Sequence, residues 1–147
     1  MSDVCARLER CGALAKEADT IRERIIRLRS ASTGTHQALS GMPRAQGKRD
    51  VVGNTVAQVE ELIARWERTI ALYLEMMGEA DEAISSLPTM SMRVVLRYRY
   101  LDGMEWPDVA DKACYSESHC RRLATAGIAE LERRERDQTA DGDGGAA

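Results

Sequence analysis

An unbroken alternation of three- and four-residue steps between apolar residues runs through residues 52–87. The apolar positions of this repeat are Val52, Val56, Val59, Ile63, Trp66, Ile70, Tyr73, Met77, Ala80, Ile84 and Leu87. A repeat of about 3.5 residues held over about five heptads is typical of a coiled-coil seam. Trp66 and Met77 keep the spacing of the seam, so we interpret them as core residues and not as part of a ligand pocket. The repeat therefore predicts one long helix that packs against another.

A second amphipathic helix is predicted over residues 4–29. Its apolar residues also recur every three or four positions, at Val4, Leu8, Cys11, Leu14, Ala18, Ile21, Ile25 and Leu28. Residues 30–50 are rich in Ser, Thr, Gly and basic side chains and show no period, which predicts a long flexible connection. The long helix pairs either with this first helix, folded back as an antiparallel hairpin, or with the same helix of a second subunit. The pattern does not choose between them.

Composition favours an all-α protein, because Ala, Leu, Glu and Arg dominate, Phe is absent and only three prolines occur. The net charge of -3 excludes a protein that coats nucleic acid through bulk electrostatics.

We find no apolar run long enough for a membrane span and no signal peptide, so we expect a cytoplasmic location. Cys5, Cys11, Cys114 and Cys120 form no CxxC pair, and we interpret them as small buried residues within helices.

The C-terminal third carries start and stop signals for three shorter helices. Pro88 ends the long helix or begins the next, Asp102 and Gly103 predict a helix end, and Pro107 suits a first helical turn. Cys114 and Tyr115 form the next turn, and Ser116 is a good N-cap for the last helix. The inner faces are predicted from the apolar residues Val94, Val95, Tyr98 and Leu101, then Val109, Ala110 and Ala113, then Cys120, Leu123, Ile128 and Leu131.

A short helix, a tight turn and a capped second helix have the spacing of a helix-turn-helix, whose second helix lies in the major groove. We predict the DNA-binding residues Ser116, Glu117, Ser118, His119, Arg121 and Arg122 on the polar side of that helix, with Arg97 and Arg99, and also Arg93, available for backbone contacts. The alternative is a three-helix bundle with a charged surface, because Asp108, Asp111 and Glu117 weaken any positive patch.

The run from Leu87 to Leu131 resembles the fourth region of bacterial sigma factors. The resemblance is carried by the LP start, the LRYRYLDG run, the VA pair and the Ser that opens the last helix. Closer still is a likeness to phage-encoded regulators of the RinA and ArpU type, which share the RY, the Gly and Trp before the VA pair and the Tyr-Ser turn. The resemblance implies a phage or prophage transcription regulator. Two positions depart from it: Cys114 stands where Gly is usual, and Glu105 where Ser or Thr usually caps the helix.

The expected architecture has three parts. Residues 1–87 form an antiparallel coiled-coil helix pair, residues 88–134 a three-helix helix-turn-helix domain, and residues 135–147 a tail whose Gly, Asp and Ala content predicts disorder.

We expect a sequence-specific transcription regulator that binds double-stranded DNA as a homodimer. The alternatives are a DNA-packaging protein similar to a small terminase subunit and an adaptor that binds host RNA polymerase. An enzyme is not expected, because the sequence offers no catalytic arrangement or phosphate loop. We expect no cofactor, since a zinc site of Cys114, His119 and Cys120 would need ligand spacings unlike those of zinc fingers.

Overall fold

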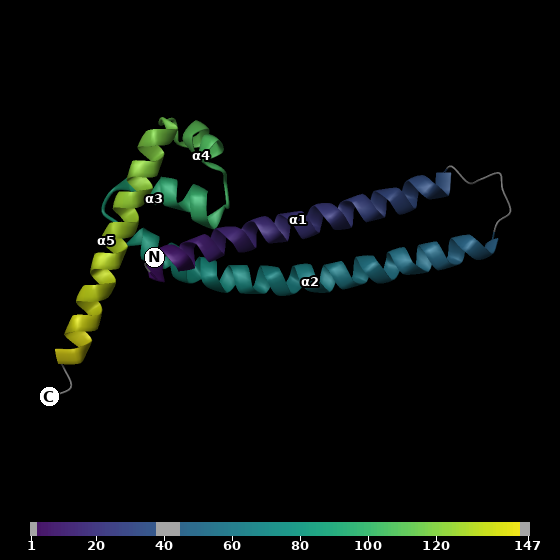
Figure 1. Cartoon of the computed structure of the whole chain (residues 1–147), viewed down its shortest axis with the longest axis horizontal. Helices are drawn as coiled ribbons and strands as arrows, with labels where there is room; N and C mark the ends of the chain where they lie inside the picture. Colours follow the sequence, from purple (N-terminus) through teal and green to yellow (C-terminus); the bar gives the residue numbers. More distant parts are fainter. Residues whose placement is uncertain (1–2, 38–44, 145–147) are drawn as a thin grey trace. The chain divides into compact units, whose positions relative to one another are not determined.

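The structure is a computed structural model that describes the backbone of residues 3–37 and 45–144 and the side chains of residues 3–31 and 53–142. Its α-helices, labelled in Figure 1, are α1 (Asp3–Gln37), α2 (Ala45–Ser85), α3 (Met90–Leu96), α4 (Trp106–Ala113) and α5 (Glu117–Gly144), and a π-helix, η1 (Arg97–Leu101), follows α3. No strand occurs among these residues, which confirms the all-α class. A bilayer span would need a longer apolar stretch than any helix in the described part of the chain provides.

Two segments expected to be irregular are largely helical. The connection predicted at residues 30–50 is shorter, because α1 continues to Gln37 and α2 begins at Ala45. No proline precedes Pro43, so the helical hydrogen bonds of α1 can continue past residue 30. Residues 38–44 lie outside the described residues.

The disordered tail predicted at residues 135–147 is also an expectation that the structure corrects. Helix α5 continues to Gly144, and residues 145–147 lie outside the described residues. Ion pairs between neighbouring turns accompany this extension: Arg133 contacts Glu130 at 2.7 Å and Asp137 at 2.9 Å. Such pairs stabilise a helix that buries little apolar surface, and composition alone did not reveal them.

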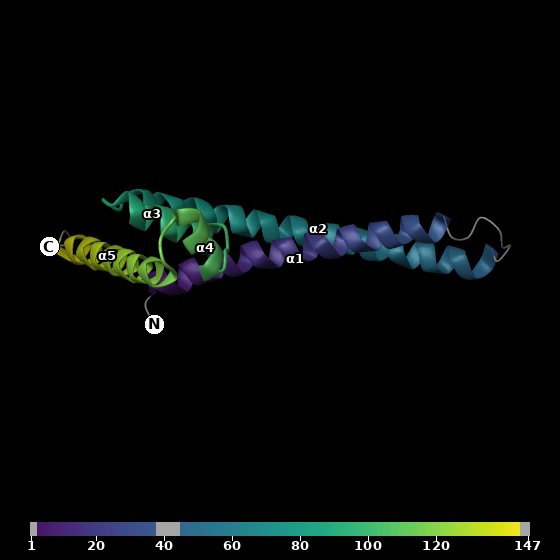
Figure 2. The ribbon, with the colours of Figure 1, turned by 90° about the horizontal axis from the view of Figure 1, so that it is seen from above.

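The chain forms two compact units, of which unit 2 contains residues 16–72. Within it, the segments of α1 and α2 lie side by side and run in opposite directions (Figures 1 and 2). Oε1 of Glu17 lies 3.4 Å from Nη2 of Arg65 across the pair. Ala18, Ile21 and Ile25 are buried, which confirms the apolar stripe predicted for the first helix in this unit.

The predicted seam of α2 is less buried in unit 2 than its repeat suggests. Its members there, Val59, Ile63, Trp66 and Ile70, are only half-buried. Val56 is 50% exposed, and Val52 lies outside the described side chains. The buried residue on this stretch of α2 is Thr69, whose hydroxyl donates a hydrogen bond to the Arg65 carbonyl at 2.9 Å. Much of the apolar seam in unit 2 therefore remains accessible.

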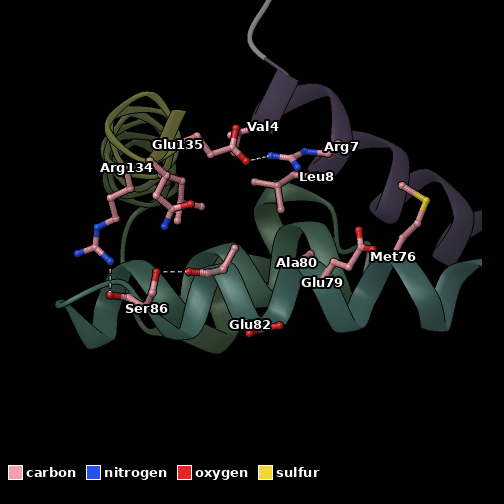
Figure 3. A pocket seen from close by; sticks show the side chains of 13 residues that line it. Val4, Arg7, Leu8, Met76, Glu79, Ala80, Glu82, Ser86, Arg134 and Glu135 are labelled. Atoms are coloured by element: carbon pink, nitrogen blue, oxygen red, sulfur yellow. Dashed lines mark hydrogen bonds and ion pairs between the residues drawn. The ribbon is translucent and has the colours of Figure 1, made fainter. Parts of the chain in front are cut away.

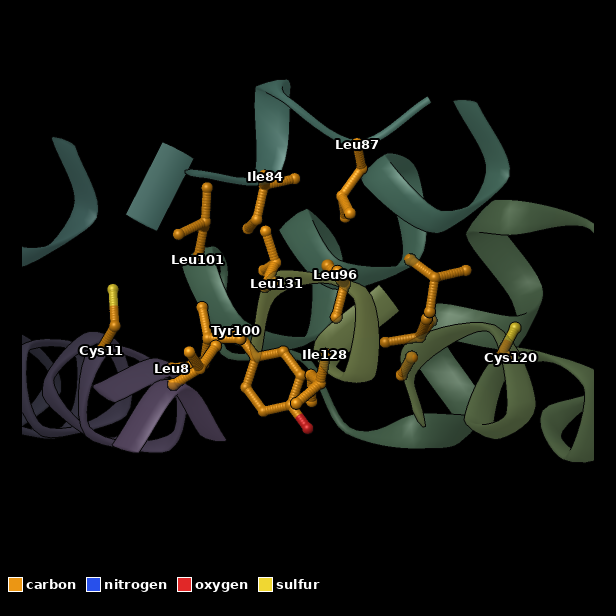
Figure 4. Packing of buried hydrophobic residues seen from close by; sticks show 14 residues of the cluster. Leu8, Cys11, Ile84, Leu87, Leu96, Tyr100, Leu101, Cys120, Ile128 and Leu131 are labelled. Carbon is orange, nitrogen blue, oxygen red and sulfur yellow. The ribbon is translucent and has the colours of Figure 1, made fainter. Parts of the chain in front are cut away.

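Unit 1 contains the residues up to 15 and those from 73 onward, and every helix contributes to its core. Figure 4 shows Leu8 and Cys11 of α1 together with Ile84 of α2 and Leu87, which follows α2, in the same apolar cluster as the C-terminal residues. The remaining core residues are Val4, Val95, Leu96, Tyr100, Leu101, Val109, Cys120, Ala124, Ile128 and Leu131. The core therefore crosses the boundary that the sequence placed at residues 87 and 88. The C-terminal region shares its core with α1 and α2 because a domain of residues 88–134 alone would bury too little surface to be stable.

A π-helical turn shifts the register after α3. The amide of Asp102 donates to the Arg97 carbonyl at 3.0 Å, and the Tyr73 hydroxyl donates to the Leu101 carbonyl at 2.5 Å. The wider turn places Tyr100 in the core, a position that the predicted inner face did not include, while Tyr98 is half-buried and packs against the core as predicted. The predicted helix end at Asp102 and Gly103 is confirmed, since η1 ends at Leu101 and Gly103 has a φ of 69°.

Helices α3 and α5 approach closely at Gly127. A Cβ atom at this position would lie 2.8 Å from Cδ1 of Leu96, which is fully buried. The missing side chain therefore allows the buried face of α5 to rest directly on α3.

A groove of about 510 Å³ lies between the first turns of α1, the last turns of α2 and the second half of α5 (Figure 3). Val4, Leu8 and Leu131 contribute apolar surface to it. Three of its charged residues contact neighbouring protein groups: Arg7 pairs with Glu135, and Nη1 of Arg134 donates to the Ser86 carbonyl at 2.5 Å. We assign no ligand to this groove.

Candidate nucleic-acid interface

The turn between α4 and α5 lies where the sequence predicts it and carries the predicted helix cap. Cys114 ends α4 in the left-handed conformation, with φ 60° and ψ 36°. The Ser116 hydroxyl accepts a hydrogen bond from the amide of His119 at 3.1 Å, which confirms the predicted N-cap. Val109 of α4 and Cys120 of α5 are both fully buried beside this turn. A fixed turn and two buried anchors thus set the direction in which α5 begins.

The non-glycine residue at the turn gives a stability prediction. The left-handed conformation costs an L-residue about 1–2 kcal/mol that glycine does not incur. Part of this gain is lost through the greater freedom of glycine in the unfolded chain. We expect Cys114→Gly to raise the free energy of unfolding in urea by about 1 kcal/mol. Cys114→Ala, which also removes the thiol but keeps the strained backbone, should change it by less than about 0.5 kcal/mol; equal effects would contradict the strain.

The predicted DNA-binding residues of α5 lie together at the surface. We call Ser116, Glu117, Ser118, His119, Arg121 and Arg122 the polar flank. All of them are exposed except His119, which is half-buried. The ring of His119 meets that of Tyr115 edge to face, with 5.0 Å between the ring centres. The polar flank is therefore accessible to a partner, and the opposite side of the helix faces the core.

Arg121 is positioned by contacts on two sides. Its Nη2 lies 2.9 Å from Oε1 of Glu117, one helical turn earlier. Its guanidinium carbon also lies 5.2 Å from the ring centre of Trp106, at the start of α4. A cation over an indole ring is attracted by the electrons of the ring face. The side chain of Arg121 is thus oriented although it is 57% exposed.

Arg99 meets the same indole ring. Its guanidinium carbon lies 4.8 Å from the ring centre of Trp106, and its Nη1 donates to the Met104 carbonyl at 2.9 Å. The same nitrogen lies 3.5 Å from a carboxylate oxygen of Glu105. The structure therefore brings Arg99 together with the polar flank through Trp106.

Arg97 and Arg93 make contacts away from the polar flank. Nε of Arg97 lies 2.9 Å from the carboxylate of Asp81, and its Nη2 donates to the Ser85 hydroxyl at 2.8 Å. Arg93 donates to the Leu87 carbonyl at 2.5 Å. These contacts tie α3 and η1 to the end of α2 and to Leu87 just after it, and the contacts of both arginines with the DNA backbone stay a prediction.

Sequence reasoning did not include Trp106, Thr125 or Lys112 among the site residues. Thr125 is exposed one turn beyond Arg121, and its position on the polar side follows from helical periodicity alone. Lys112 lies with Nζ 5.7 Å from the ring centre of Tyr98. No local pattern reveals Trp106, because its partners come from η1 and α5.

The two cysteines near the interface differ in exposure. Cys120 is fully buried, and this burial, with a smaller effect of the Glu117 charge, raises the pKa of its thiol. Cys114 is exposed and lies in the turn, so the expectation of a buried helical cysteine was wrong there. In the described part of the chain, no group of three His, Cys, Asp or Glu side chains could hold a metal ion.

The charge at this surface is mixed. Asp108, Asp111 and Glu117 are exposed beside Arg121 and Arg122, and they limit the positive potential. Hydroxyl, imidazole and guanidinium groups nevertheless project from one side of a capped helix, and these groups can bond to base edges and phosphates.

No protein-family model, no curated protein and no solved structure matches this chain.

Proposed function

We propose that this protein is a sequence-specific DNA-binding regulator of transcription. In this proposal α4, the turn and α5 act as a helix-turn-helix, and the polar flank enters the major groove of double-stranded DNA. The observation that carries the proposal is the exposure of the polar flank on a helix whose other side, at Cys120, Ala124 and Ile128, is buried in the core of unit 1. The buried face holds α5 in place, and the exposed polar flank remains accessible to DNA.

The proposed contacts with DNA are of two kinds, contacts with base edges and contacts with phosphates. Arg122 and Ser118 are exposed on the first two turns of α5, where a recognition helix meets base edges. Arginine donates two hydrogen bonds to O6 and N7 of guanine, and the start of a helix favours a phosphate. Because the chain carries a net charge of -3, affinity in this proposal comes from a local surface and not from the whole molecule.

The proposal includes a homodimer held by a coiled coil of α2. The half-buried seam residues Ile63, Trp66 and Ile70 support it, because they leave apolar surface available. Host RNA polymerase as a partner and a phage origin rest on the sequence resemblance alone, and a cytoplasmic location stays an expectation from the sequence pattern. The mass in solution separates the alternatives: a dimer fits a regulator, whereas a closed ring of many subunits fits DNA packaging.

The test is selection of binding sites from a library of random duplexes, followed by affinity measurement on the selected sequence. We expect the full chain to enrich one sequence motif. Arg122→Ala should then weaken binding to that sequence by about tenfold or more, because a base-contacting arginine contributes about 1–3 kcal/mol.

Arg133→Ala is the matched control. Arg133 is also an exposed arginine of α5, but it pairs with Glu130 and Asp137 beyond the polar flank. We expect this variant to change the affinity less than about threefold. Failure of the full chain to enrich any sequence at low salt would overturn the proposed function.

A further inference from the structure

Glu117 occupies a place where a carboxylate opposes DNA binding. It is the first residue of α5, its side chain is 44% exposed, and it belongs to the polar flank. A carboxylate at a helix start is stabilised by the helix dipole. The same carboxylate repels phosphate groups that approach this end of the helix. The position therefore favours the helix and disfavours an unselective contact with DNA.

The surroundings of Glu117 form a charge-balanced group, which we call the Trp106 cluster. It consists of Trp106, the pair Arg99 and Glu105, and the pair Arg121 and Glu117. Each arginine lies near the indole ring, and each has its own carboxylate within 3.5 Å. Two positive and two negative charges leave no net charge in the cluster.

This balance affects the two modes of DNA binding differently. Non-specific binding depends almost entirely on cations that contact phosphates, so an arginine already paired with a carboxylate contributes little to it. Binding to a matching sequence also gains hydrogen bonds to bases, and these can compensate for the separation of Arg121 from Glu117.

We propose that Glu117 is a specificity-determining residue, which holds Arg121 against Trp106 and thereby lowers the affinity for non-matching DNA. This inference rests on the proposed function, and it adds a role for the acidic member of the polar flank. In the absence of a matching sequence, Arg121 stays in its pair with Glu117. Removal of the carboxylate makes Arg121 available to any phosphate.

The experiment measures binding of the full-length Glu117→Gln protein to a duplex of mixed sequence over a range of salt concentrations. We expect its affinity at low salt to rise about threefold to tenfold. The slope of log K against log salt should steepen by about 0.9, the value for one added phosphate contact. Unchanged affinity and slope would overturn the inference.

Two further variants define the mechanism. Glu130→Gln removes the same charge from α5, but the arginines that it pairs with, Arg133 and Arg134, lie beyond the polar flank, so the mixed-sequence affinity should stay unchanged. In the double variant Glu117→Gln, Arg121→Ala the gain should disappear. A gain that persists without Arg121, or an equal gain in Glu130→Gln, would overturn the role of the pair.

Two different experimental results would contradict the role of Glu117 and the proposed DNA binding. If neither the wild-type protein nor Glu117→Gln binds any duplex at low salt, DNA binding itself is wrong. If the wild-type protein selects a sequence and Glu117→Gln leaves the affinity for mixed DNA unchanged, the proposed function stands and the role of Glu117 does not.

Discussion

Replacement of Leu96 by alanine is expected to lower the free energy of unfolding by about 3 kcal/mol. Leu96 has 0% of its surface exposed, and it lies in the core of unit 1 against the backbone of α5 at Gly127. A buried leucine that becomes alanine loses its transfer free energy and leaves a cavity, which together cost about 2–5 kcal/mol. Chemical denaturation followed by circular dichroism measures the change.

Leu72→Ala is the control for this substitution. Leu72 is also a helical leucine, but 47% of its surface is exposed. The same chemical change there should cost less than about 1 kcal/mol, because little surface is withdrawn from water and no closed cavity forms. Equal losses in the two variants would show that Leu96 does not occupy a closely packed position.

A fragment of residues 88–134, the domain that the sequence pattern delimits, is expected to remain unfolded by itself. The fragment lacks the core residues Val4, Leu8, Cys11, Ile84 and Leu87. Full burial of one large aliphatic side chain contributes about 1.5–3 kcal/mol, and a whole domain is stable by about 5–15 kcal/mol. Loss of these contacts therefore removes an amount comparable to the total stability.

Thermal unfolding and amide chemical-shift dispersion measure this outcome, with the full chain as the reference. The full chain should show a cooperative transition and dispersed amide signals, and the fragment neither. A cooperative transition in the fragment would mean that the first turns of α1 and the end of α2 are not needed for the fold.

Local sequence signals predicted the turns of the C-terminal region well. Pro107 lies in the first turn of α4, Ser116 caps α5, and Gly103 has the positive φ expected after a helix end. Each of these signals acts over a few residues of backbone, so no knowledge of distant contacts is needed. The exposure of Arg121 and Arg122 followed from helical periodicity for the same reason.

The remaining features depend on contacts between distant segments. The burial of Tyr100 required the π-helical turn, whose last carbonyl accepts a hydrogen bond from Tyr73 of α2. The contribution of Leu8 to the C-terminal core required the packing of α1 in unit 1. The contacts of Arg99 and Arg121 with Trp106 join three elements. Periodicity within one helix contains none of this information.

The absence of a side chain at Gly127 constrains more than its own position. With Cδ1 of Leu96 only 2.8 Å from where a Cβ atom would stand, any atom added to α5 there requires a displacement or a shorter side chain on α3. The two sites thus share one volume, so a side chain added at position 127 is expected to cost less stability when the side chain at position 96 is shorter. The effects of substitutions at positions 96 and 127 on stability are therefore expected to be non-additive, although the two residues are far apart along the chain.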